Sequence, residues 1–153
     1  MIRMNPRIAD ALIKIDFIRR YEELSHRFSA AKMPAVNQLE RIDRKKVLGA
    51  IEKQGYSAKY YAKEKFFQIQ EQIENMTFAV HIRFHSGRVE MIWVVRDNGE
   101  LLLGRPWFEY SCELIDIDYV IKSAYAGTYE TLDEILEITF GMYEDFKQAV
   151  LNT

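Results

Sequence analysis

The middle of the chain strongly constrains the fold, because it contains short apolar segments separated by turn residues. Residues 78–85 alternate apolar and polar side chains, the period of an amphipathic strand, and we interpret this strand as an edge strand. Residues 89–95 are apolar on both faces, which favours a central strand. Residues 97–99 (Asp-Asn-Gly) predict a two-residue hairpin, since Asn-Gly adopts positive φ readily. A short strand over 101–103 completes an antiparallel β-meander.

The segment before the meander, residues 60–74, fits two patterns. One set of apolar positions has helical spacing: Ala62, Phe66, Ile69 and Ile73. A second set, broken only by Glu71, fits a strand: Phe67, Ile69 and Ile73. We favour the strand, because the next strand begins too soon for a helix to turn back and because a meander needs at least three strands for stability.

Helical periodicity dominates the first 55 residues. Asn5-Pro6 predicts a helix start, since Asn caps a helix and Pro is tolerated at its first position. One helix is expected over about 6–29, with its buried face formed by Ile8, Leu12, Ile13, Ile15, Phe17, Tyr21, Leu24 and Phe28. A second helix begins near Leu39, or restarts at Asp43 as its N-cap, and ends at Gly55.

The C-terminal part is predicted to be helical as well. Pro106 begins a short helical or irregular segment through Ile117. Residues 131–134 (Thr-Leu-Asp-Glu) have the pattern of a capping box and begin a helix to about 151. Its expected buried face is Leu132, Leu136, Thr139, Tyr143, Phe146 and Val150.

These elements predict a single α+β domain over residues 1–153. It has N-terminal helices, an antiparallel β-meander of three to four strands, and a C-terminal helix packed on the sheet. The apolar start of the chain is interrupted by Asp10, Lys14 and Asp16, so we expect no signal peptide, no membrane association and a cytoplasmic location.

Charge is divided unevenly along the chain. The total is 21 basic against 23 acidic residues, which excludes a uniformly basic nucleic-acid-binding protein. Residues 1–65 hold 15 Lys and Arg against 8 Asp and Glu, whereas residues 66–153 hold 6 against 15. Two explanations are open: the halves pack on each other through complementary charge, or one half binds an external charged partner.

Known catalytic and metal-binding patterns do not occur in the sequence. The seven glycines form no phosphate-binding loop, and Cys112, the single cysteine, is interpreted as a small buried side chain. His81 and His85 lie roughly 13 Å apart on one strand face, too far to ligate one ion, and we interpret them as facing solvent. We therefore predict no enzymatic activity, no cofactor and no metal.

Acidic residues mixed with tyrosines form the candidate site for a protein partner. On the last helix, Asp133, Glu137 and Glu144 share one row, Glu134 and Asp145 share the next, and Gly141 permits close approach. Tyrosines provide contact area and carboxylates accelerate encounter with a basic partner, although a solvated acidic face would have the same pattern. The predicted partner-binding residues are Asp116, Asp118, Tyr119, Tyr125, Tyr129, Asp133, Glu134, Glu137, Gly141, Glu144 and Asp145.

A second candidate surface is the basic second helix. Its polar side carries Arg41, Arg44, Lys45, Lys46 and Lys53, and three tyrosines follow at Tyr56, Tyr60 and Tyr61. Basic side chains beside aromatic ones are typical of nucleic-acid surfaces, whereas an ordinary solvated helix face explains the charges equally.

From Phe78 onward the chain resembles small cytoplasmic immunity proteins of bacterial polymorphic-toxin systems of the contact-dependent inhibition type. The resemblance rests on residues 94–99, 104–108 and 131–150 and covers about half of the chain. It implies a non-enzymatic protein that binds its cognate toxin domain, possibly a nuclease, and blocks it. We therefore expect a toxin inhibitor acting through the acidic, tyrosine-rich surface. A nucleic-acid-associated regulator that uses the basic N-terminal helices is the alternative.

Overall fold

An antiparallel meander forms the centre of the molecule, here described for residues 4–153 from a computed structural model. Its five strands follow one another in chain order: β1 (Lys59–Tyr61), β2 (Phe66–Ile73), β3 (Met76–His85), β4 (Arg88–Asp97) and β5 (Glu100–Pro106). A sixth, two-residue strand, β6 (Ala124–Tyr125), pairs with the start of β4. The predicted α+β class is confirmed, although β1 and β6 were not predicted.

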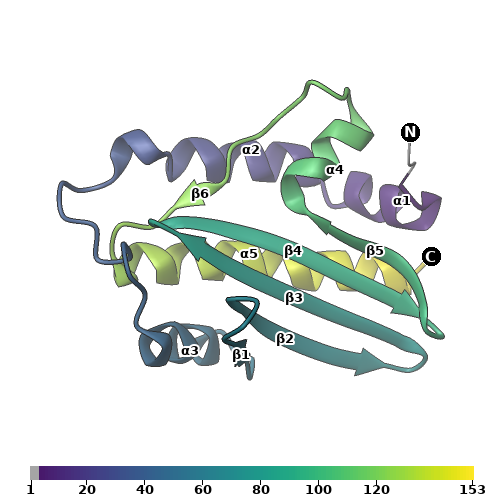
Figure 1. Ribbon diagram of the computed structural model, residues 1–153. Helices are drawn as coiled ribbons and strands as arrows, with labels where there is room; N and C mark the ends of the chain where they lie inside the picture. The colour runs from purple at the N-terminus through teal and green to yellow at the C-terminus, as the bar shows by residue number, and fades with distance from the viewer. Residues whose placement is uncertain (1–3) are drawn as a thin grey trace.

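Five α-helices accompany the sheet: α1 (Pro6–Lys14), α2 (Phe17–Arg27), α3 (Arg44–Lys53), α4 (Trp107–Leu114) and α5 (Tyr129–Leu151). Figure 1 shows α5 running behind the sheet, with α1 and α2 along one side of it and α3 at the other. Over the described residues, no helix covers the sheet face turned toward the viewer (Figure 1). The fold therefore has one layer of helices on one face of the sheet.

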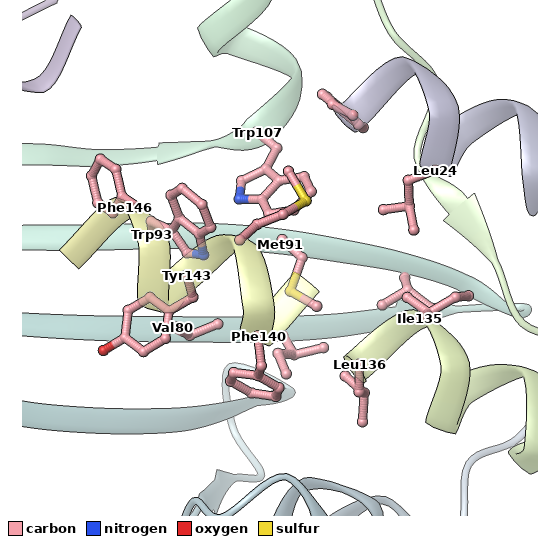
Figure 2. Close-up of a cluster of buried hydrophobic side chains, with 14 of the residues drawn as sticks. Leu24, Val80, Met91, Trp93, Trp107, Ile135, Leu136, Phe140, Tyr143 and Phe146 are labelled. Atoms are coloured by element: carbon pink, nitrogen blue, oxygen red, sulfur yellow. The ribbon is translucent and has the colours of Figure 1, made fainter. Parts of the chain in front are cut away.

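The hydrophobic core lies between α5 and the sheet (Figure 2). Trp93 of β4 stacks on Phe146 of α5 at 4.6 Å between ring centroids and meets Trp107 edge-on at 5.0 Å. All six positions predicted for the buried face of α5 are buried: Leu132, Leu136, Thr139, Tyr143, Phe146 and Val150. The C-terminal helix packed on the sheet is therefore confirmed.

The meander agrees with the sequence patterns in all but one respect. Residues 66–73 form a strand, and Asn98 and Gly99 have φ values of 50° and 84°, as the hairpin prediction requires. The prediction that residues 78–85 form an edge strand was wrong, because β3 lies between β2 and β4. Alternating apolar and polar residues indicate that one face of a strand is solvated, whether or not the strand lies at an edge. In β3 the solvated face is on the side of the sheet that no described helix covers.

The long first helix was wrongly predicted as continuous. Asp16, with φ 58° and ψ 45°, separates α1 from α2. The break changes the helical phase, so Ile8 and Leu12 are buried before it and Phe17 and Tyr21 after it. Ile13, which the sequence analysis placed on the buried face, is 67% exposed. That prediction was wrong because it counted the spacing from Ile13 to Phe17 across the break.

Helix ends follow local capping chemistry. The Asp43 side chain accepts hydrogen bonds from the backbone N–H groups of Lys45 and Lys46 at 3.0 and 3.3 Å, which confirms the helix restart at Asp43. The start predicted at Thr131 was wrong, because Thr128 is the N-cap of α5 and accepts from the Thr131 N–H at 3.1 Å. The segment after Pro106 is the helix α4, and β5 continues through Pro106 itself.

Candidate protein-binding surface

Most carboxylates predicted on α5 face a cation from the N-terminal half. Three ion pairs flank the helix: Asp133 with Lys53 at 3.3 Å, Glu134 with Arg27 at 3.3 Å, and Asp145 with Arg20 at 2.9 Å. The two predicted rows thus point to opposite neighbours, Asp133 to α3 and the other two carboxylates to α2. The uneven charge along the chain is used within the fold, which is the first of the two explanations left open above.

These exposed pairs contribute little stability, about 0.2–1 kcal/mol each, but they neutralise the acidic row. Glu137 is exposed and forms no ion pair within residues 4–153. Gly141 is also exposed, and a Cβ placed there would meet no atom within 4 Å. Within the described residues, two exposed carboxylates of α5 therefore have no ion pair, Glu130 and Glu137.

Glu144 belongs to a polar network that the sequence did not reveal. The Lys147 ammonium, 5% exposed, lies 2.7 Å from both Glu144 and Glu71, and the Tyr143 hydroxyl donates to Glu71 at 2.6 Å. The Tyr56 hydroxyl donates to Glu144. Burial raises the pKa of Glu144, but the hydrogen bonds from Lys147 and Tyr56 outweigh it, so the pKa lies below its ordinary value. Glu144 therefore has a structural partner and is a poor probe of binding.

Replacing Gly141 with alanine is expected to raise the free energy of unfolding by about 0.5–1 kcal/mol, because glycine in a helix interior loses more backbone entropy and the new methyl group has open space. Urea denaturation would measure the change. Gly55→Ala is the matched control with the opposite sign, since φ at Gly55 is +91°. A loss of stability in Gly141→Ala would contradict the conclusion that a methyl group at this position meets no other atom.

A second part of the predicted surface is the loop between α4 and β6, which projects from the top of the molecule in Figure 1. Among residues 4–153, seven large apolar side chains are exposed, and four of them lie between residues 108 and 120. They are Phe108 at 41%, Ile115 at 52%, Ile117 at 72% and Val120 at 64% exposed. We call residues 115–120 the apolar loop. It also carries the predicted Asp116, Asp118 and Tyr119.

Hydrogen bonds fix this loop to the rest of the fold. The buried Ser111 hydroxyl donates to the Tyr119 carbonyl at 2.7 Å, and the Tyr119 hydroxyl donates to Glu22 of α2 at 2.9 Å, which raises the pKa of Tyr119. The buried Tyr21 hydroxyl, whose pKa burial raises to about 12, donates to the Ile121 carbonyl. The loop therefore presents its apolar side chains in a defined conformation.

The two remaining predicted tyrosines lie apart from each other. Tyr125 is on β6, whereas the Tyr129 hydroxyl accepts a hydrogen bond from the Asp43 N–H at 2.9 Å and the Lys46 ammonium lies 5.1 Å from the ring centroid. Of the eleven predicted residues, three therefore lie on the apolar loop, seven on α5, with Tyr129 as its first residue, and Tyr125 lies on β6. The exposed isoleucines were missed because apolar side chains in a sequence are expected to be buried.

The basic helix α3 and the tyrosines after it also have intramolecular partners. The Arg44 guanidinium lies 4.5 Å from the Tyr60 ring centroid, and Tyr56 stacks on Phe140 of α5 at 4.4 Å. Lys53 is paired with Asp133, as described above. Few of the groups proposed for nucleic-acid contact are therefore unoccupied.

The other candidate residues have ordinary surroundings. His81 is half-buried and stacks on Phe66 at 4.4 Å, and burial lowers its pKa. Cys112 is half-buried, so the prediction of full burial was wrong. Within the described range, no group of three or more His, Cys, Asp and Glu side chains is placed to hold a metal ion.

No described helix has the length and apolar character needed to cross a membrane.

Comparison of the chain with known protein families, with curated proteins and with solved structures found no match. The resemblance to immunity proteins therefore stays a prediction.

Proposed function

We propose that this protein is a non-enzymatic inhibitor that binds a bacterial toxin domain through the apolar loop. The observation that carries the proposal is the exposure of Ile115, Ile117 and Val120 on one short segment. Contiguous exposed apolar side chains on a small domain mark interaction sites, since burying them against a partner removes apolar surface from water.

The composition of the loop favours a basic partner. Asp116 and Asp118 alternate with the apolar side chains, and Glu22 lies beside Tyr119. Exposed apolar side chains interspersed with carboxylates suit a partner whose own apolar side chains lie among Lys and Arg. A nuclease toxin has such a surface, because it binds phosphates, and an inhibitor that places carboxylates there blocks substrate access.

The hydrogen bonds at the C-terminal end of the loop support the same function. Association costs conformational entropy when a loop must be ordered on binding. Here hydrogen bonds from Ser111, Tyr21 and the Tyr119 side chain already hold the loop. This preorganisation suits an inhibitor that must bind tightly. The alternative, a nucleic-acid-associated regulator, has less support, because Arg44, Lys46 and Lys53 are engaged within the fold.

The test takes the protein domains encoded by the genes next to that of this protein as candidate toxin domains. Ile117→Arg combined with Val120→Arg should weaken binding at least about thirtyfold, as expected when a central apolar contact is replaced by a charge that also opposes a basic partner. Surface plasmon resonance would measure the dissociation constant, and growth of cells that express the toxin would measure protection.

Ile13→Arg is the matched control, because Ile13 is 67% exposed but lies on α1. This control should bind and protect like the parent protein. Equal binding by the parent and by the double variant would refute the apolar loop as the binding surface, and failure of the parent to bind the neighbouring toxin would refute the inhibitor function.

A further inference from the structure

A groove beside the apolar loop differs from it in charge. It has a volume of about 510 Å³ and lies between the C-terminal end of α2, the start of β4, and residues 120–125. Its polar lining residues are Ser25, Ser29, Arg88, Lys122, Ser123 and Tyr125. None of the described residues that line it carries a carboxylate. The groove therefore combines two cations with four hydroxyl groups.

Arg88 is the unusual member of this set. Its Nε atom is fully buried and has no hydrogen-bond partner in the described part of the chain. Its guanidinium also forms no ion pair there, although Glu90 lies on the same face of β4 two residues further on. Buried donors in folded proteins are nearly always paired, so this guanidinium is unusual. A ligand cannot reach the buried Nε, but the terminal nitrogens of Arg88 form no hydrogen bond or ion pair within residues 4–153 and are the donors that a ligand in the groove would meet.

Lys122 supplies the second charge at the same groove. Its side chain is exposed and, like that of Arg88, has no ion pair among residues 4–153. An arginine fork and an ammonium together match a phosphate group, which offers several oxygen acceptors and more than one negative charge. A carboxylate has fewer acceptors and would leave part of this donor set unpaired.

The groove also has apolar lining residues. Phe108 and Val120, both exposed, line it together with Ile121. These side chains suit an organic group attached to the phosphate, and the volume lies within the range of small-molecule sites. We propose that this groove binds a phosphomonoester of a small organic molecule, with Arg88 and Lys122 holding the phosphate. This proposal does not rest on toxin binding, although Val120 belongs both to the groove and to the apolar loop.

Calorimetric titration of the full chain with phenyl phosphate, at ionic strength held constant with sodium chloride, tests the proposal. Saturable binding is expected, with inorganic phosphate weaker because it lacks the apolar group and benzoate weaker because it lacks the phosphate. Arg88→Gln should lower the affinity for phenyl phosphate at least about tenfold, the loss expected for a charge-assisted hydrogen bond. Lys122→Gln should lower it by a smaller factor.

Arg96→Gln is the matched control, because Arg96 is an exposed arginine on the same strand but does not line the groove. It should bind like the parent. The proposal fails if phenyl phosphate shows no saturable millimolar binding, if benzoate binds as tightly, or if Arg96→Gln loses as much affinity as the groove variants. Lys122 is exposed, so its variant decides the question should Arg88→Gln not fold.

Discussion

Replacing Trp93 with alanine is expected to lower the free energy of unfolding by about 3–5 kcal/mol, the range for truncation of a large buried aromatic side chain. Trp93 is 1% exposed and contacts aromatic rings from several elements. Its neighbours are Phe17 of α2, Trp107 and Tyr110 of α4, and Tyr143 and Phe146 of α5. The cavity left behind would border α2, α4, α5 and the sheet, so it cannot be filled by movement of one element alone.

Equilibrium urea denaturation would measure this loss. Phe108→Ala is the control, because it removes an aromatic ring that is 41% exposed and should cost far less. A loss below about 1 kcal/mol for Trp93→Ala would mean that β4 is not at the centre of the core.

The parts of the fold that the sequence predicted correctly depend on local patterns. Asn98-Gly99 favours its own turn because few residues tolerate positive φ, and the alternation of apolar and polar residues over 78–85 favours a strand. The buried stripe of α5 follows from helical spacing alone. Such signals do not depend on which other element packs against them.

The parts that the sequence did not predict depend on contacts between distant residues. The break at Asp16 places Phe17 against Trp107 at 5.0 Å, and no local residue requires it. The two residues of β6 form a strand only because the start of β4 has a free edge beside them. These features are consequences of packing, which periodicity does not describe.

The candidate site was predicted in composition but not in arrangement. The acidic residues of α5 were identified, yet the sequence could not show that Arg20, Arg27 and Lys53 lie beside them. For the apolar loop, the only local sign of exposure was that Ile115 and Ile117 alternate with Asp116 and Asp118. The two isoleucines are exposed because of where the loop lies, between α4 and β6.

Replacing Lys147 with methionine is expected to lower the free energy of unfolding by about 2–3 kcal/mol at neutral pH. Removing one partner of a fully buried ion pair costs about 3–5 kcal/mol, because the other charge remains buried and unpaired. Here the loss is smaller, since the side chains of Glu71 and Glu144 are 33% and 48% exposed and stay in contact with water. Methionine fills most of the lysine volume, so the change reports mainly the charge.

Urea denaturation of the parent and of Lys147→Met at several pH values would measure this cost. Gln148→Met is the control, because Gln148 is the exposed neighbour on α5 and should tolerate the same side chain within about 0.5 kcal/mol. If Lys147→Met were no less stable than Gln148→Met, the ion pairs to Glu71 and Glu144 would contribute nothing to stability.

The pH dependence separates lost charge pairing from lost packing. In the parent, the pKa of Glu144 lies below its ordinary value of 4.5, so its contribution is present above that value and is lost as the pH falls through the folded-state pKa. Without Lys147, the largest of the interactions that lower the pKa of Glu144 is lost, so this pKa is higher in the variant than in the parent and protonation relieves the unpaired charge at a higher pH. The stability difference between parent and variant should therefore shrink as the pH falls from about 7 to about 4, whereas a packing defect would keep it constant. Adding Glu71→Leu to Lys147→Met removes a carboxylate that the variant leaves unpaired, so this double variant should recover part of the loss at neutral pH.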